Sequence, residues 1–439
     1  MRIAVVGSGA AGLGAALALS ERHDVRLFER ASKFGGHANT VDVETPEGRL
    51  PVDAGFIVFN ERNYPNLTAM FAHLGVPSKP SDMSFGFSLD GGRFEYACDD
   101  LDRIFAQRRN VLNPRFLMAF RDVMRFVRQA PADLASGALS GLSLGEWLNA
   151  RGYGAWFRER FILPMGGAIW STPTEHMLDF PAANFVSFFG NHDLFTGLAR
   201  AMQWRTVEGG SRAYVEAIAA RLSNRAVTGA GVTAARRSGG MVELSFSDGS
   251  EGRFDHVVFA CHAPDAFRAI DDLDERERGI LGAFRTTANR AVVHSDPALM
   301  PKRRKVWSSW TMLFEGERRG DAGQPVTLSY WMNRLQSLPT SRDLFVTLNG
   351  QRDPDPALTH AVFDYAHPLY DEAAFAAQAR LDEIQGQGGY WYAGAWTGWG
   401  FHEDALRSGL RVAEALDARP DWARDLGPAL VRDYDLAAE

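Results

Sequence analysis

A glycine motif near the N-terminus constrains the fold more than any other feature of the sequence. It reads Gly-Ser-Gly-Ala-Ala-Gly over residues 7–12, directly after the apolar run 3–6 and before the helix-forming stretch 13–22. The first glycine permits a tight turn, the second lets the backbone approach a pyrophosphate, and the third lets the helix pack on the strand, with its N-terminus facing the anion. The motif therefore predicts a strand–turn–helix unit that binds a dinucleotide. The predicted contacts of this loop are Gly7, Gly9, Ala10, Ala11 and Gly12.

The adenosine half of the dinucleotide has predicted contacts of its own. A second strand is expected over residues 24–28, and Glu29 follows it, seventeen residues after Gly12. An acid at about this distance from the motif, roughly 20 residues, binds ribose hydroxyls. Val232 lies in a later strand that we expect to contact adenine, and residues 253–260 resemble the strand that closes a sheet of this kind.

The residues after Glu29 favour FAD over NAD. Residues 30–40 resemble the RxGG(R)xxT extension of FAD-containing amine oxidases and desaturases, and His37 stands where those proteins carry arginine. Residues 51–57 resemble the strand that brings the backbone close to the isoalloxazine ring in the same superfamily. The predicted contacts in these segments are Arg30, Gly35, Gly36, His37, Gly55 and Phe56. The sequence has no second glycine motif for NAD(P)H, so we expect the substrate to reduce the flavin.

The C-terminal region resembles another flavin-binding segment. Residues 392–409 resemble the GxxxxAxxSG helix of this superfamily, whose start points amide groups at the flavin C2 carbonyl. A helix N-terminus stabilises negative charge, which reduced flavin carries. Ala395 stands where relatives carry an acid for the ribityl chain, and no cysteine lies in the segment, so non-covalent FAD is expected. The predicted contacts here are Gly394, Ala395, Phe401, His402 and Ala405.

Length and composition narrow the class of protein. The chain has 439 residues, and a single hydrophobic core stops growing at roughly 250–300, so at least two domains are expected. A formal net charge of -7 argues against nucleic-acid partners. Cys98 and Cys261 are far apart and in no metal-ligand spacing, which predicts no disulfide, no metal site and a cytoplasmic protein. Outside the apolar run that contains the glycine motif, residues 3–20, the longest apolar stretch is near residues 161–170. It is about half of the roughly 20 residues that a spanning helix needs, so any membrane contact would be peripheral, at the inner face.

These observations predict the fold class and its division. We expect an α/β fold in which a Rossmann-type FAD-binding domain, glutathione reductase-like and of the amine oxidase type, carries an inserted α+β substrate domain. Residues 1–80, 205–290 and 386–439 are assigned to the FAD-binding domain, and residues 81–204 and 291–385 to the substrate-binding domain.

The inserted regions supply the candidate substrate residues. Residues 161–171 and 185–192 are apolar and aromatic, and they either line a long cavity facing the flavin or form ordinary core. His192 and His402 each lie beside a segment expected near the ring. These two histidines and Tyr64 are the candidate catalytic bases, provided that one of them reaches hydrogen-bonding distance of the substrate.

Residues 113–129 predict an amphipathic helix with arginines opposite its apolar face. Such a helix suits an anionic lipid surface, whereas a helix packed on its own domain with a solvated basic face explains the same pattern. The sequence leaves both interpretations open. The expected apolar face contains Phe116, Leu117, Phe120, Met124 and Val127, and the arginines in this region are Arg103, Arg108, Arg109, Arg115, Arg121, Arg125 and Arg128.

Longer segments extend the resemblance beyond the nucleotide site. The chain is similar to a bacterial flavoprotein group whose members also form the N-terminal half of plant cyclopropane fatty acid synthases. This group lies within the amine oxidase, phytoene desaturase and protoporphyrinogen oxidase superfamily. The resemblance implies work on modified acyl chains and a lipid methyltransferase as a partner. The shared segments are residues 35–38, 55–60, 64–66, 80–85, 112–114, 169–171 and 191–192.

The leading functional hypothesis is dehydrogenation of an unsaturated or methyl-branched fatty acyl chain, free or in a phospholipid. Hydride would pass from an allylic carbon to flavin N5, and a base would remove the second proton. An acyl double-bond isomerase, an amine oxidase-like oxidase and a non-redox partner that presents lipid to a methyltransferase remain as alternatives. Amine oxidation is the less favoured reaction, because many amine oxidases keep a lysine near flavin N5 and none of the four lysines of this chain could be placed there. These lysines are Lys33, Lys79, Lys302 and Lys305.

Overall fold

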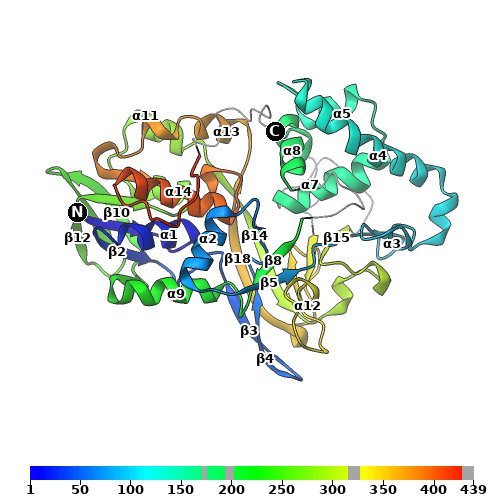
Figure 1. Cartoon of the computed structure of the whole chain (residues 1–439), viewed down its shortest axis with the longest axis horizontal. Helices are drawn as coiled ribbons and strands as arrows, with labels where there is room; N and C mark the ends of the chain where they lie inside the picture. The colour runs from blue at the N-terminus through cyan, green and yellow to red at the C-terminus, as the bar shows by residue number, and fades with distance from the viewer. Residues whose placement is uncertain (171–175, 193–201, 315–326, 428–439) are drawn as a thin grey trace.

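Two β-sheets with helices packed around them account for most of the molecule (Figure 1). In the computed structural model, residues 1–170, 176–192, 202–314 and 327–427 are described. The α/β fold expected from the sequence is confirmed. Within the described residues, no helix is both long and apolar enough to cross a membrane.

The first sheet is parallel and is formed by segments that are remote in sequence. Its strands pair in the order β19-β13-β1-β2-β9. Ile3, Ala4 and Val5 of the central strand are fully buried, as expected for a strand covered on both faces. The strands are β1 (Arg2–Val6), β2 (Asp24–Glu29), β9 (Ala226–Thr228), β13 (His256–Phe259) and β19 (Tyr390–Tyr392).

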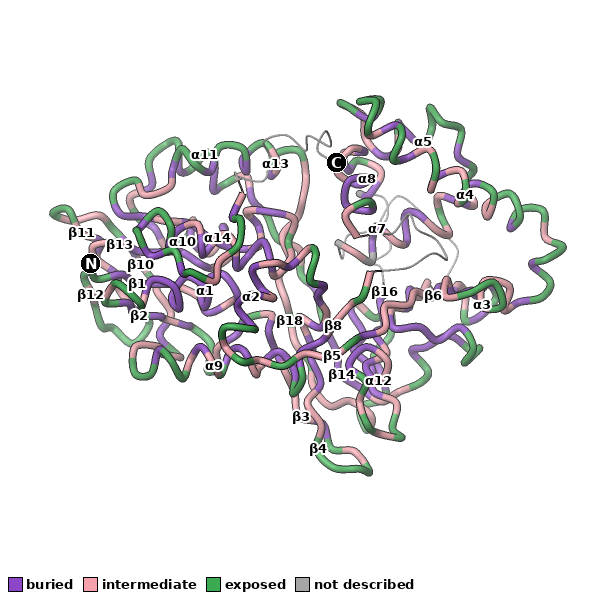
Figure 2. The backbone as a smooth tube through the Cα atoms, viewed as in Figure 1, coloured by how far each residue is buried: buried purple, intermediate pink, exposed green. Residues whose placement is uncertain are grey.

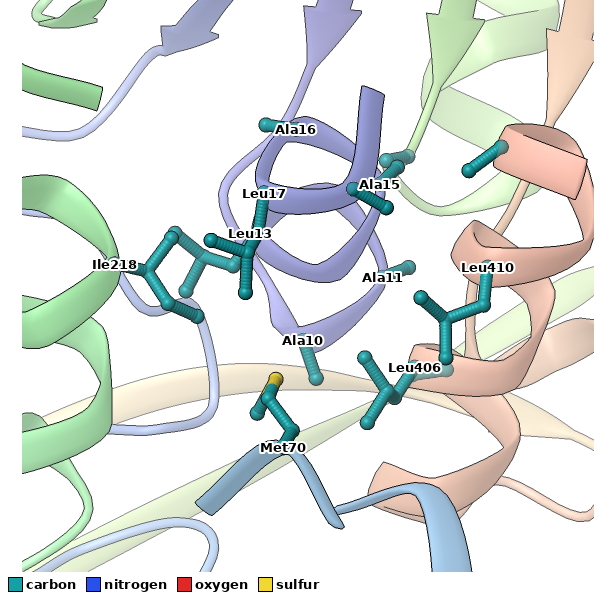
Figure 3. Close-up of a cluster of buried hydrophobic side chains, with 14 of the residues drawn as sticks. Ala10, Ala11, Leu13, Ala15, Ala16, Leu17, Met70, Ile218, Leu406 and Leu410 are labelled. Atoms are coloured by element: carbon teal, nitrogen blue, oxygen red, sulfur yellow. The ribbon is translucent and has the colours of Figure 1, made fainter. Parts of the chain in front are cut away.

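Helix α1 (Ala10–Leu19) follows β1 and is buried along its whole length. It packs between α14 (His402–Ala415), α9 (Arg212–Leu222) and α2 (Pro65–Leu74). Figure 3 shows side chains of these three helices next to those of α1. A Cβ on Gly409 of α14 would lie 2.2 Å from the carbonyl oxygen of Ala11. The backbones of α1 and α14 therefore approach to a distance that only glycine permits at this position.

The second sheet has the strand order β18-β14-β17-β16-β15-β6-β7 and is antiparallel except where β15 pairs with β6. One of its faces packs into a hydrophobic cluster that includes Phe87, Met312 and Val346. The strands are β6 (Phe85–Leu89), β7 (Phe94–Ala97), β14 (Arg285–His294), β15 (Trp310–Phe314), β16 (Thr327–Trp331), β17 (Phe345–Leu348) and β18 (Thr359–Leu369). The domain division made from the sequence stays a prediction, and β14 crosses its boundary at residues 290 and 291.

Smaller sheets connect these layers. A hairpin pairs β3 (Thr40–Thr45) with β4 (Gly48–Asp53), and β5 (Ser78–Ser81) pairs with β8 (Trp204–Val207). A three-stranded sheet contains β10 (Val232–Ser238), β11 (Met241–Phe246) and β12 (Glu251–Phe254).

A helical group covers one end of the second sheet (Figure 1). Phe126, Trp147, Phe157 and Phe185 form its aromatic core. The helices of this group are α3 (Leu101–Ile104), the 3-10 helix η1 (Arg108–Leu112), α4 (Pro114–Ala135), α5 (Leu144–Ala150), α6 (Ala155–Phe157), α7 (Leu163–Trp170) and α8 (Ala182–Asn191). Elsewhere the chain forms α10 (Ala263–Ala269), α11 (Glu275–Leu281), α12 (Met332–Leu335) and α13 (Glu372–Gln378).

The buried face of α4 differs from the expected one. Phe116 and Phe126 are buried, but Leu117 and Met124, which we assigned to the apolar face, are 44% exposed. Packing follows positions 116, 119, 123, 126 and 130, which share one side of a helix with 3.6 residues per turn. Leu117 and Met124 are rotated away from that side, so their assignment to the buried face was wrong.

Candidate active site

A continuous cavity of about 560 Å³ extends from the loop between β1 and α1 to the second sheet. Sixteen of the eighteen predicted cofactor contacts line it; the exceptions are Gly12 and Gly35. A Cβ on Gly12 would lie 1.9 Å from the carbonyl oxygen of Gly7, and a Cβ on Gly35 would lie 2.4 Å from that of Ala38. These two glycines therefore shape the loops, and their assignment as cofactor contacts stays a prediction. The cavity-lining contacts are Gly7, Gly9, Ala10, Ala11, Glu29, Arg30, Gly36, His37, Gly55, Phe56, Val232, Gly394, Ala395, Phe401, His402 and Ala405.

The start of α1 fits a phosphate group. Gly7 has a φ of +102°, and a Cβ on Gly9 would meet no protein atom within 4 Å, so the backbone at Gly9 is open to the cavity. No side chain in the described part of the structure caps this end of α1, and the first turn of the helix carries no acid. A helix N-terminus with free amides is an anion site. A Cβ on Gly36 would lie only 3.2 Å from the Cα of Gly9, so the loop containing residues 35–37 packs on the same end.

Glu29 is held rigidly at the end of β2. Its Oε2 accepts hydrogen bonds from the Ser8 backbone N–H at 2.9 Å and from the Ser8 hydroxyl at 2.6 Å. Its Oε1 accepts from the Ala31 N–H at 2.8 Å. The side chain is 8% exposed and lines the cavity, so the carboxylate has a fixed position there. Its contact with the ribose stays a prediction.

His37 places an unsatisfied nitrogen at the cavity. Its Nε2 is buried and has no hydrogen-bond partner among the described residues. The ring stacks on Tyr365, with ring centroids 4.7 Å apart, and lies 5.3 Å from the ring of His367. Burial, and then the neighbouring histidines, hold the pKa of His37 well below its usual range. The imidazole is therefore neutral near pH 7 and offers a buried polar atom to a bound group.

The second sheet contributes cavity residues that the sequence analysis missed. Tyr365, His367 and Tyr370 lie on or directly after β18 and line the cavity, and the rings of Tyr365 and His367 lie beside His37. The Tyr365 hydroxyl accepts a hydrogen bond from Asn39 Nδ2 at 2.7 Å. This bond connects β18 to residues 30–40, the segment that resembles the extension of FAD-containing proteins. Aromatic residues at 363, 365 and 367 alternate with a period of two, and this alternation was the available signal.

His402 is tightly held at the start of α14. Its ring stacks on Phe56 with centroids 3.8 Å apart, and its Nε2 lies 3.1 Å from the Tyr214 hydroxyl. Burial lowers the pKa of His402 to about 3. An imidazole with so low a pKa is a weak proton acceptor, which disfavours His402 as the catalytic base.

The other two candidate bases also line the cavity, and they differ from each other. Burial, together with the nearby Asp404 and Glu403, raises the pKa of Tyr64 far above its usual range, so Tyr64 is a neutral phenol and not a phenolate base. His192 donates from Nδ1 to the carbonyl oxygen of Phe188 at 3.0 Å. In the neutral ring this tautomer leaves Nε2 as the proton-accepting nitrogen.

The part of the cavity away from the nucleotide loop is apolar. The acids among its described lining residues are Glu29 and Asp265, and Asp265 lies 3.7 Å from the guanidinium of Arg30 at the nucleotide end. No described lysine lines the cavity. Residues of both inserts form the apolar walls, namely Met83, Phe85, Met165, Ile169, Phe188 and Trp310.

Of the two cysteines, both of which the structure describes, Cys261 lines the cavity. Burial raises the pKa of its thiol to about 12, so the thiol is protonated and a poor nucleophile near neutrality. This agrees with a cofactor held by hydrogen bonds and packing.

Comparison with known proteins agrees with this geometry. Residues 10–288, more than half of the chain, match the family described as flavin containing amine oxidoreductase, and the chain belongs to that family. FAD is the family's cofactor, and the open phosphate loop, the fixed Glu29 carboxylate and the unsatisfied His37 nitrogen fit it. Two Mycobacterium tuberculosis strains have proteins named as flavin-containing monoamine oxidase AofH, each 26% identical to this chain over 285 residues. The match covers 62% of this chain and 59% of those relatives.

Solved structures show the same fold. A redesigned putrescine oxidase is similar with a TM-score of 0.68 and 16% identity, covering 95% of this chain and 99% of that one. A CLA-producing fatty acid isomerase from P. acnes is similar with a TM-score of 0.66 and 15% identity, covering 95% of this chain and 98% of that one. Identities this low establish the likeness of fold alone.

Proposed function

We propose that this protein dehydrogenates an unsaturated or methyl-branched fatty acyl chain, free or within a phospholipid. The observation that carries the proposal is the apolar half of the cavity, where Met165, Ile169, Phe188 and Trp310 form walls without a charged side chain among the described lining residues. Apolar walls gain free energy by removing acyl methylenes from water, at about 0.8 kcal/mol for each buried CH₂.

Among the described residues, no acid lines this end of the cavity, which argues against an amine substrate. A substrate ammonium group buried in an apolar cavity needs an opposite charge or a set of acceptors, because an isolated buried charge is costly. Glu29 and Asp265, the acids among the described lining residues, lie at the nucleotide end. The names of the relatives therefore do not decide the substrate of this chain.

The side chains can divide the work of the reaction. Bound FAD supplies a two-electron acceptor for hydride from an allylic carbon. His192 Nε2 then takes the proton from the neighbouring carbon, since its Nδ1 is already committed as a donor to Phe188. The apolar walls orient the chain and keep water away. Stacking of His402 on Phe56 holds the start of α14 in place at the cavity.

The flavin spectrum tests the proposal directly. Holoenzyme is mixed anaerobically with a methylated unsaturated phospholipid, with the corresponding free fatty acid, or with putrescine. Bleaching of the oxidised flavin by a lipid, but not by putrescine, is expected. Bleaching by the amine alone would instead establish an amine oxidase. An unchanged spectrum with every lipid and with putrescine would overturn the proposed reaction and favour a non-redox role in presenting lipid.

A second candidate function is isomerisation of an acyl double bond. The likeness of fold to the fatty acid isomerase favours considering it, because the same apolar cavity suits a reaction in which hydride returns to the chain. Mass spectrometry of the product separates the two reactions. A loss of two hydrogens supports dehydrogenation, whereas an unchanged mass with a displaced double bond supports isomerisation.

A further inference from the structure

We infer that an exposed surface on η1 and α4 binds an anionic lipid bilayer. This surface, called here the α4 surface, combines apolar and basic side chains at the end of the molecule away from the N-terminus, where Figure 2 shows exposed stretches along α4. Its apolar members are Val111, Leu112, Leu117, Met118 and Met124, and its basic members are Arg108, Arg109, Arg115, Arg121 and Arg128. The inference goes beyond the proposed function, and its test does not require turnover.

Exposed apolar side chains concentrate on this surface. Among the described residues, nine large hydrophobic side chains are exposed, and six of them lie between Leu101 and Met124. Leu112 is 86% exposed and Met118 is 58% exposed. Single exposed apolar residues are ordinary on a soluble protein, but a contiguous group marks a site of interaction. The concentration therefore indicates a surface that contacts something other than water.

The charge of the surface selects an anionic partner. Arg115, Arg121 and Arg128 are exposed and form no ion pair with any described residue. The two acids of α4 are buried and engaged elsewhere. Asp122 accepts from the Gly154 N–H, and Asp133 accepts from Trp147 Nε1. The exposed side of α4 is thus positive in a protein whose net charge is -7.

The helical spacing interleaves the two kinds of side chain. Leu117, Arg121, Met124 and Arg128 are three or four residues apart and share one side of α4. Guanidinium groups that reach lipid phosphates beside apolar side chains that enter the acyl boundary are the pattern of an interfacial helix. A protein partner would need acids placed against each arginine, whereas an anionic bilayer presents its negative charge everywhere.

The inner side of α4 connects this surface to the cavity wall. Phe116 belongs to the hydrophobic cluster that contains Tyr330 and Leu348, and Trp310 packs against that cluster. Tyr330, Leu348 and Trp310 line the cavity. Lipid bound at the α4 surface would therefore lie on the side of the molecule that carries the second sheet, away from the nucleotide loop (Figure 1).

Vesicle flotation with the holoenzyme tests the inference. The probes are vesicles of phosphatidylcholine alone and of an equimolar mixture with phosphatidylglycerol. Binding to the anionic vesicles only, weakening as ionic strength rises, is expected. Arg121→Gln with Arg128→Gln should weaken this partition by roughly 20- to 30-fold, since each basic residue near an anionic surface contributes a factor of about five. Leu117→Gln with Met118→Gln should also weaken it.

Matched variants at the other end of the molecule serve as controls. Arg22→Gln with Arg26→Gln removes the same charge from exposed positions, and Val227→Gln removes an exposed apolar side chain. Both controls should bind vesicles like the wild type. Absence of wild-type binding at low ionic strength, or equal losses in variants and controls, would overturn the inference. A dimer in sedimentation analysis that Leu117→Gln with Met118→Gln abolishes would assign the surface to a second copy of the chain instead.

Discussion

Two glycines of the N-terminal motif have different roles, one in cofactor binding and the other in folding. A Cβ on Gly9 would enter the cavity, whereas a Cβ on Gly12 would collide with the Gly7 carbonyl oxygen. Gly9→Ala should therefore change the unfolding free energy of the apoprotein by less than about 1 kcal/mol. It should weaken FAD binding roughly tenfold or more, because a hydrogen bond to a charged group contributes about 1.5–3 kcal/mol. FAD titration followed by fluorescence measures this affinity.

The matched variant Gly12→Ala should show the opposite pattern. Its Cβ has no space beside the Gly7 backbone, and overpacking of this kind costs about 1–3 kcal/mol. Urea unfolding of the two apoproteins should therefore rank Gly12→Ala well below Gly9→Ala. Equal stability of the two variants would contradict the separate roles of these glycines.

Burial of His294 should make the free energy of unfolding depend on pH. The ring is buried, its Nε2 lies 2.7 Å from Thr347 Oγ1, and burial lowers its pKa to about 4. Because the folded pKa lies below the unfolded value of about 6.5, the unfolded state binds more protons, and stability is lost as pH falls from about 6.5 towards 4. Between pH 7 and pH 5 this loss is about 2 kcal/mol. His294→Gln should lack that component in urea unfolding, and an identical pH dependence in wild type and variant would refute the assignment.

At the scale of elements, Glu403 joins two helices of the candidate site. Its carboxylate, on α14, accepts from the backbone N–H groups of Asn66 and Leu67 at 2.9 Å and so caps the start of α2. Glu403→Gln replaces an acceptor oxygen by a donor there and should lower the unfolding free energy by about 1–3 kcal/mol. Glu414→Gln changes an exposed charge on the same helix and should stay within about 0.5 kcal/mol. Thermal or urea unfolding that fails to separate these two variants would argue against the cap.

Elements with a local signature were predictable from the sequence, and elements that depend on long-range pairing were not. The glycine motif fixed β1 and α1 because turn geometry and helix packing are local properties of residues 7–12. The register of β14 with β18, in which Asn289 lies opposite Tyr365, depends on residues far apart in sequence. Tyr365 and His367 were therefore missed as cavity residues. The burial of α4 was misjudged for the same reason, since its partners decide which side is covered.

At the scale of the whole molecule, FAD should bind both halves of the structure. The cavity is lined by the loops of the first sheet and by β18 of the second, and Tyr365 stacks on His37 across them. A ligand that binds only the folded state stabilises it by about 2.7 kcal/mol at a concentration of 100 Kd. Holoenzyme should accordingly melt in one transition, at a higher temperature than the apoprotein.

Tyr365→Ala should reduce that stabilisation although Tyr365 lies outside every glycine motif. The substitution removes the ring that stacks on His37 and the acceptor for Asn39 Nδ2, so His37 loses its fixed position beside the cavity. Tyr365→Phe keeps the stacked ring and loses only the hydroxyl, so its FAD affinity should fall less than that of Tyr365→Ala. Calorimetric titration of the apoproteins with FAD compares them. If all three proteins bound FAD equally, the cofactor would be held by the first sheet and its loops alone, and the second sheet would serve only the substrate.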